Sequence, residues 1–169
     1  MQVLAKLDNA LLAVLRAGVA LTMAVTTVCV ILQVYFRYVL NAPLAWSEEL
    51  ARYSMIWGAF LGGPLAIRNG MNVGITLVTD RLPAGMQRAA LILNSILVIV
   101  FLAGLARYGH EFATMFSFQR SPVMRAPMNL IYIAIPISAA LGILQTIIVT
   151  VQQLRSWPAG ADAGETRPN

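Results

Sequence analysis

Charged residues are scarce in this sequence, and their scarcity decides the class of protein. Of its 169 residues, 59% are hydrophobic and only 11% carry a charged side chain. A soluble domain of this length needs far more polar surface to face water. The composition therefore excludes a soluble domain and predicts an integral membrane protein.

Residues that bind metals and cofactors are also few. The sequence has one cysteine, Cys29, inside the first apolar run, and one histidine, His110. A lone thiol forms no disulfide within the chain, and a single histidine provides neither a zinc ligand set nor a two-histidine haem site. The sequence also contains no Gly-rich phosphate loop. It therefore predicts no enzyme, no catalytic or metal-binding residue and no cofactor.

Long apolar runs predict an all-α integral membrane protein with four transmembrane helices. The runs lie at about 17–36, 44–67, 89–106 and 128–151. They approach or exceed the length that a helix needs to cross about 30 Å of hydrocarbon. We expect one membrane domain, residues 1–155, and a disordered C-terminal tail, residues 156–169. A cleaved signal peptide is the alternative for the first run, but no small-x-small cleavage site follows it before Arg37.

Short interfacial amphipathic segments are expected beside these spans. Residues 1–16 combine apolar residues at helical spacing with charged ones, which predicts a segment at the membrane surface. A second such element is expected near 73–81, after a turn at Asn69 and Gly70. The third helix is predicted to project beyond the bilayer to about Phe118, and Pro136 should kink the fourth.

Basic residues outnumber acidic ones, 12 to 7, but they stand singly at the ends of apolar runs. This scatter excludes a nucleic-acid-binding patch and leaves lipid as the surrounding medium. With four spans, more of the basic residues fall on the side that holds both termini and the middle loop. The positive-inside rule then predicts that both termini lie in the cytoplasm.

An acidic doublet begins the second apolar run. The charge-free part, residues 53–67, rises only about 22 Å as a helix, so a helix that spans the bilayer must begin near Leu44. Glu48, Glu49 and Arg52 then enter the headgroup layer, with each acid at helical spacing from the arginine. Arg37, before the break at Pro43, is placed to reach the second carboxylate. Two interpretations remain open, a contact motif and a solvated charge pair that marks the membrane boundary.

Small residues recur four positions apart in the same run, at Gly58 and Gly62. This spacing lets two helix backbones approach closely, so we expect that face to pack on another helix, either within the chain or in a partner.

Residues 33–70, QVYFRYVLNAPLAWSEELARYSMIWGAFLGGPLAIRNG, resemble the signature region of the small membrane subunit of tripartite ATP-independent periplasmic (TRAP) transporters. The resemblance covers nearly the whole chain in length and in its four-span layout. The matching positions are Arg37, Tyr38, Pro43, Trp46, Glu48, Glu49, Arg52, Trp57, Gly62 and Gly70. The middle loop departs from the family pattern, because Asn72 and Thr76 replace titratable residues, although Asp80 is retained.

The resemblance implies a sodium-driven importer in the bacterial inner membrane. Its partners would be a large multi-span membrane subunit, which carries solute and sodium, and a periplasmic solute-binding protein. This chain would scaffold the large subunit, with the acidic doublet and Arg52 fixing the register, and Arg120 and Arg125 would help to dock the binding protein. The competing predictions are a membrane anchor of a respiratory enzyme and an autonomous four-span exporter.

Overall fold

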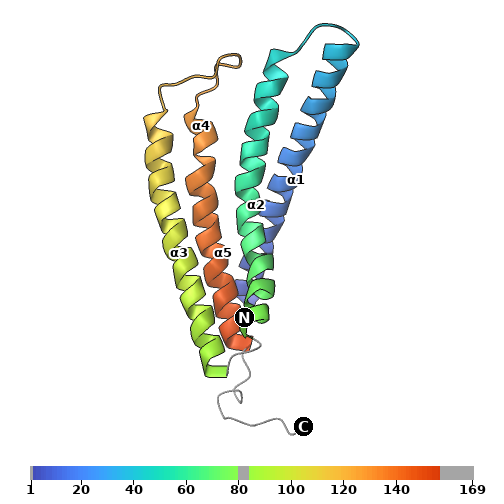
Figure 1. The fold of residues 1–169 in the computed structure, drawn as a ribbon. Coiled ribbons are helices and arrows are strands. Elements are labelled where there is room, and N and C mark those ends of the chain that lie inside the picture. The colour runs from blue at the N-terminus through green and yellow to red at the C-terminus, as the bar shows by residue number, and fades with distance from the viewer. Residues whose placement is uncertain (1, 80–83, 157–169) are drawn as a thin grey trace.

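Long helices make up the computed structural model, which describes residues 2–79 and 84–156. Their order is shown in Figure 1. The helices are α1 (Gln2–Tyr38), α2 (Ala45–Thr79), α3 (Ala84–Met115), α4 (Asn129–Tyr132) and α5 (Ala134–Ser156). Within the described residues the protein is all-α, as the apolar runs predict.

The helices form two antiparallel pairs, α1 with α2 and α3 with α5, and α2 also packs on α5. The α1–α2 turn and the α3–α4 loop lie at one end of the bundle, which we call the loop end (Figure 1). The start of α1 and the end of α5 lie at the opposite end, which we call the terminal end. Both ends of the described chain therefore lie on the same side of the bundle.

Three of the described helical segments are long and apolar enough to cross a bilayer, Asp8–Tyr38, Met86–Met115 and Asn129–Arg155. Each exceeds the roughly 20 residues that span the hydrocarbon. The protein is therefore a multi-pass membrane protein. The second helix does not meet the same criterion, although it is 35 residues long.

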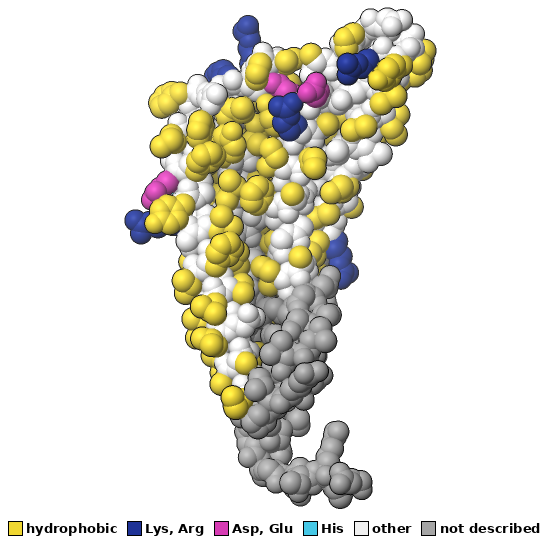
Figure 2. All heavy atoms as spheres, viewed as in Figure 1, with side chains coloured by type: hydrophobic (Ala, Val, Ile, Leu, Met, Phe, Trp, Pro, Cys, Tyr) yellow, Lys and Arg dark blue, Asp and Glu magenta, His cyan; other side chains and the backbone are white. Residues whose placement is uncertain are grey.

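Most apolar side chains on α1 and α3 are exposed. In an apolar 18-residue stretch of each span, only 6% of the residues of α1 and 17% of those of α3 are buried inside the chain, compared with 44% in the last span. Figure 2 shows the resulting apolar surface, with charged side chains mostly near the loop end among the described residues. The core lies along α5, between α2 and α3, and the outer faces of α1 and α3 are free to meet lipid or another protein.

Residues 1–16 are predicted to lie at the membrane surface and to lead into the first span. Residues 2–16 do lead into that span, as the first turns of α1, but their placement as a surface segment is wrong. Their apolar face packs inside the bundle, with Leu12 and Leu15 buried together with Asp8. An amphipathic pattern indicates which side of a helix is apolar, but not whether that side meets lipid headgroups or other helices.

The predicted turn at Asn69 and Gly70 is also wrong, since α2 continues as one helix to Thr79. The side chains of Asn72 and Thr76 and the whole of Asp80 lie outside the described residues, as does the predicted tail from residue 157 onward. The third helix ends at Met115, three residues before the predicted Phe118.

The last span is interrupted at Ile133, between α4 and α5, three residues before Pro136. Pro136 has no amide hydrogen, so the carbonyl of Tyr132 loses its usual partner three to four residues onward. Backbone bonds from Ile133 to Asn129 (2.9 Å) and from Ile137 to Ile133 (3.2 Å) continue on either side.

The contact between α1 and α2 depends on a glycine, and this gives a first prediction. A Cβ atom added at Gly58 would lie 2.8 Å from Oγ1 of Thr22, whereas one added at Gly62 meets nothing within 4 Å. Overpacking of this kind costs about 1–3 kcal/mol. Gly58→Ala should therefore lower the thermal stability of the detergent-solubilised protein, and Gly62→Ala should leave it unchanged or slightly raised. Equal effects of the two substitutions would contradict the observed helix contact.

Candidate functional site

The α3–α4 loop at the loop end is closed by its own backbone. Ser121 donates its amide to Ala126 (2.9 Å) and Met128 donates to Gln119 (3.0 Å), next to a short antiparallel bridge between Arg120 and Pro127. A left-handed residue, Arg125 (φ 52°), makes the tight turn possible. The result is a compact hairpin that leans toward the start of α2 (Figure 1).

Three aromatic rings support the base of this hairpin. Phe112 lies on the last turn of α3, and Phe116 follows directly after the helix. The two rings contact each other, and both contact Tyr132 of α4, with ring centroids 4.8–5.3 Å apart. Tilted and edge-on contacts at these distances are favourable. The rings therefore fix the two ends of the loop relative to each other.

Glu49 holds the hairpin against α2. Its carboxylate accepts hydrogen bonds from the hydroxyl of Ser121 (3.0 Å) and from the backbone amides of Val123 (3.2 Å) and Met124 (2.8 Å). Glu49 is only 7% exposed and Ser121 2%. We call this group of four residues the loop clasp. Hydrogen bonds to an ionised group are stronger than neutral ones, so a single side chain fixes a loop more than 70 positions away in sequence.

Glu48 behaves differently from its neighbour. It pairs with Arg52 at 2.9 Å across one turn of α2, and both side chains are more than 60% exposed. An exposed pair of this kind contributes little to stability. The structure thus separates the doublet, with Glu49 used inside the chain and Glu48 and Arg52 on its surface. A pairing of Glu49 with Arg52 or Arg37, which the sequence left open, is not what the structure shows.

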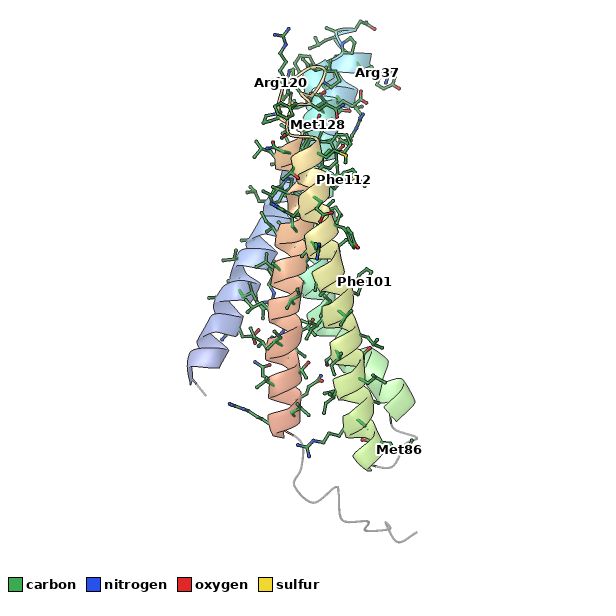
Figure 3. All side chains as sticks on the ribbon, turned by 90° about the vertical axis from the view of Figure 1, so that its left-hand side faces the viewer. Arg37, Met86, Phe101, Phe112, Arg120 and Met128 are labelled. Atoms are coloured by element: carbon green, nitrogen blue, oxygen red, sulfur yellow. The ribbon has the colours of Figure 1, made fainter. Side chains whose placement is uncertain are left out.

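The other predicted positions lie mostly on the surface of the loop end. Arg37, Tyr38, Pro43 and Trp46 are exposed, Trp57 is half-buried, and Gly58 is buried against α1. Arg120 and Arg125 are exposed on the hairpin, where Nη1 of Arg120 donates to the carbonyl of Arg125 at 3.4 Å. Figure 3 labels Arg37, Arg120 and Met128 at this end of the molecule.

An open cavity of about 190 Å³ lies where α1 leads into α2. It is lined by Gln33, Arg37, Pro43, Leu44, Ala45 and Glu48. Arg37 and Glu48, which the sequence singled out, therefore share a depression without forming an ion pair.

A second polar cluster, near the terminal end, is one that sequence reasoning missed. Asp8 of α1 forms an ion pair with Arg68 of α2, and it accepts hydrogen bonds from the side-chain amides of Gln145 and Gln152 of α5, each at 3.2 Å. Asp8 is 3% exposed and Gln145 is fully buried. We call these four residues the polar junction. It joins three helices at one point, and no local pattern could reveal it because the partners lie 60 to 144 positions apart.

A hydroxyl pair extends this polar contact from α5 to α3. Thr150 donates to Ser95 at 2.8 Å, and Ser95 is buried. Hydrogen bonds between helices add specificity where apolar packing alone would allow sliding. All long helices are therefore linked by polar contacts as well as by apolar surface.

Neither cluster is arranged for catalysis. Their polar atoms form hydrogen bonds and ion pairs within the chain, apart from the buried Oε1 of Gln145, which has no partner among the described residues. The part of the protein that the structure describes holds no group of three or more His, Cys, Asp or Glu side chains that could bind a metal. What the clusters can do is fix the positions of helices and of one loop.

A family model decides the membership of this chain. The model described as "Tripartite ATP-independent periplasmic transporters, DctQ component" matches residues 26–156, which is most of the sequence. The chain belongs to the DctQ family of TRAP transporter components. The family resemblance predicted from residues 33–70 is thereby confirmed.

Relatives within the DctQ family are small permease proteins or longer permeases. The chain is 28% identical over 145 residues to the ectoine TRAP transporter small permease protein TeaB of Halomonas elongata, covering 85% of this chain and 73% of TeaB. It is 32% identical over 81 residues to the sialic acid TRAP transporter small permease protein SiaQ of Vibrio cholerae, covering 48% and 47%.

A third relative is the isethionate TRAP transporter permease protein DctMQ of Oleidesulfovibrio alaskensis. It is 28% identical over 102 residues, which are 59% of this chain but only 16% of DctMQ. The chain therefore spans about half the length of SiaQ and a small part of DctMQ. The named relatives are transport components and not enzymes, which agrees with the prediction that the chain is not an enzyme.

Proposed function

We propose that this protein is the non-catalytic small permease subunit of a sodium-driven TRAP-type solute importer, and that it scaffolds the large transport subunit. The observation that carries the proposal is the contrast between a bundle locked at both ends and the apolar faces of α1 and α3 left uncovered. A rigid bundle with free apolar faces is suited to supporting a partner in the membrane. The partner would be a large multi-span subunit, in keeping with the size of DctMQ, of which the matched region is a small part.

We propose that α2 is the fourth span. It is 35 residues long and lies antiparallel to α1, which is long and apolar enough to cross the bilayer. Three of its charged residues lie near the loop end, namely Glu48, Glu49 and Arg52. The fourth, Arg68, is paired with Asp8 near the terminal end. Neither position requires an unpaired charge at the bilayer centre.

With four spans, the basic-residue bias favours the terminal end on the cytoplasmic side of the inner membrane. The loop end, with the α3–α4 hairpin, would then face the periplasm. This hairpin is the proposed docking surface for a periplasmic solute-binding protein. It presents Phe118, which is 97% exposed, together with the exposed Arg120 and Arg125.

Charge reversal on the hairpin tests the docking role. Arg120→Glu/Arg125→Glu should weaken binding of the periplasmic protein to the membrane complex about tenfold and reduce the salt dependence of its association rate, because exposed charges steer docking. Arg155→Glu, an exposed arginine near the terminal end, is the matched control and should have no effect. Unchanged binding by the double variant would remove the hairpin as a docking surface.

Copurification tests the scaffold role. A tagged chain expressed with the large subunit should recover that subunit in constant ratio, and the complex should show no haem absorption. Failure to recover the large subunit would contradict the proposed function. A haem band in the purified complex would also contradict it and would favour a respiratory anchor.

A further inference from the structure

The exposed face of α3 carries a polar side chain inside its apolar segment. Asn94 is exposed and makes no side-chain hydrogen bond within the described part of the chain. It lies six residues after Arg88 and well before Arg107, so it sits roughly 9 Å along the helix from the nearest charge. An unpaired carboxamide in contact with hydrocarbon is unfavourable, since lipid tails offer it no partner.

Asn94 begins a stripe of mostly exposed residues on one flank of α3, in which only Gly104 is half-buried. At steps of three and four residues it is followed by Leu97, Phe101, Gly104 and Tyr108. Leu97, Phe101 and Tyr108 are 60–70% exposed, and a Cβ atom added at Gly104 would meet nothing within 4 Å. Figure 3 shows Phe101 on the side of α3 that faces away from α5. The stripe therefore has an amide at one end and a gap between two bulky rings farther along.

The exposed side of α1 does not combine an unbonded, exposed amide with a gap between bulky side chains. Thr27, an exposed polar residue in the middle of α1, donates its hydroxyl to the carbonyl of Met23 at 2.9 Å and so needs no external partner. A face of this kind is compatible with lipid alone. Gln33 of α1 also has an unbonded amide nitrogen, but it is half-buried and lines the cavity where α1 leads into α2. The exposed amide of Asn94 therefore distinguishes the α3 flank as a surface that favours a protein partner.

We infer that the stripe from Asn94 to Tyr108 is the surface on which a transmembrane helix of the large permease subunit packs. This inference rests on the proposed function, because it assumes that a large subunit is present. The partner helix presents a hydrogen-bonding side chain at the depth of Asn94 and a bulky apolar side chain opposite Gly104. Small residues admit close approach of two helices, and an amide bonded across the contact fixes their register.

Site-specific photocrosslinking of the complex in membranes tests this surface. The crosslinking residue is placed at Leu97 or Phe101 on the stripe, and at Ile96 or Ala103 as exposed controls of similar depth on the other flank. We expect adducts with the large subunit to be several-fold more abundant from 97 and 101 than from 96 and 103. Adducts with a second copy of this chain, or equal yields from the two flanks, would overturn the inference.

Substitution of Asn94 gives an independent readout. Asn94→Leu should lower recovery of the large subunit about fivefold, the effect of losing one hydrogen bond between membrane helices. The same variant alone in detergent should be as stable as the parent or more so, because it loses an unpaired polar group. Ile96→Leu is the control and should change neither property.

The outcomes separate the inference from the proposed function. If the large subunit copurifies but crosslinks only outside the stripe, the packing surface is wrong and the subunit role stands. If the large subunit does not copurify with the parent chain at all, the proposed function fails and the inference fails with it.

Discussion

Glu49→Gln is expected to release the α3–α4 hairpin from α2, whereas Glu48→Gln is expected to leave it in place. The carboxylate of Glu49 accepts three hydrogen bonds, two of them from backbone amides of the loop. A carboxamide has only one accepting oxygen, so the substitution places a donor against at least one loop amide. Within the described residues, the side chain of Glu48 is hydrogen-bonded to Arg52 alone, and it is exposed.

Hydrogen–deuterium exchange measures the release. Exchange of the peptide that contains Val123 and Met124 should become at least about tenfold faster in Glu49→Gln, because hydrogen bonds to charged groups are among the stronger ones in proteins. Peptides within α5 should exchange at the parental rate. Solute uptake should fall with the same variant if the hairpin docks the binding protein. Parental exchange in Glu49→Gln, or equal acceleration in Glu48→Gln, would contradict the loop clasp.

Asp8→Ala is expected to be strongly destabilising. It leaves Arg68 without its carboxylate and removes the acceptor for the fully buried Gln145. Breaking a buried ion pair by deleting one partner costs about 3 kcal/mol or more. The free energy of unfolding in mixed detergent micelles should fall by about that amount, and the yield of folded protein should fall with it.

Two comparison variants test whether the loss of stability comes from the buried ion pair. Glu111→Ala breaks an ion pair with Arg107 whose side chains are both more than 60% exposed, so it should change stability little. Asp8→Leu/Arg68→Leu removes both charges and should be more stable than Asp8→Ala, because no unpaired charge remains. If Asp8→Ala matched Glu111→Ala, the polar junction would not hold the helices together.

The apolar runs could predict the long membrane helices because the thickness of hydrocarbon sets the length of an apolar helix. The interruption near Pro136 could also be predicted, since a missing amide hydrogen is a local property. The continuation of α2 through Asn69 and Gly70 could not. A glycine costs a helix only about 1 kcal/mol relative to alanine, so the wider structure readily outweighs a local turn preference.

The polar contacts could be predicted only in part. Glu49 attracted attention because a carboxylate beside an apolar run needs a partner, but its partners are two backbone amides and a serine, and backbone amides carry no sequence signal. The buried position of Asp8 could not be predicted, because an acid in an amphipathic segment is expected to face water. The polar residue Gln145 within the last apolar run was the available clue to a buried contact.

Uptake by purified components in proteoliposomes distinguishes a required scaffold subunit from an autonomous transporter. We expect sodium-dependent uptake only when this chain, the large permease subunit and the binding protein are all present, with background flux when any of them is omitted. We also expect that Asp8→Ala reduces uptake in proportion to the loss of assembled complex. Transport of solute by this chain alone, or full uptake by the large subunit and binding protein without it, would contradict the account.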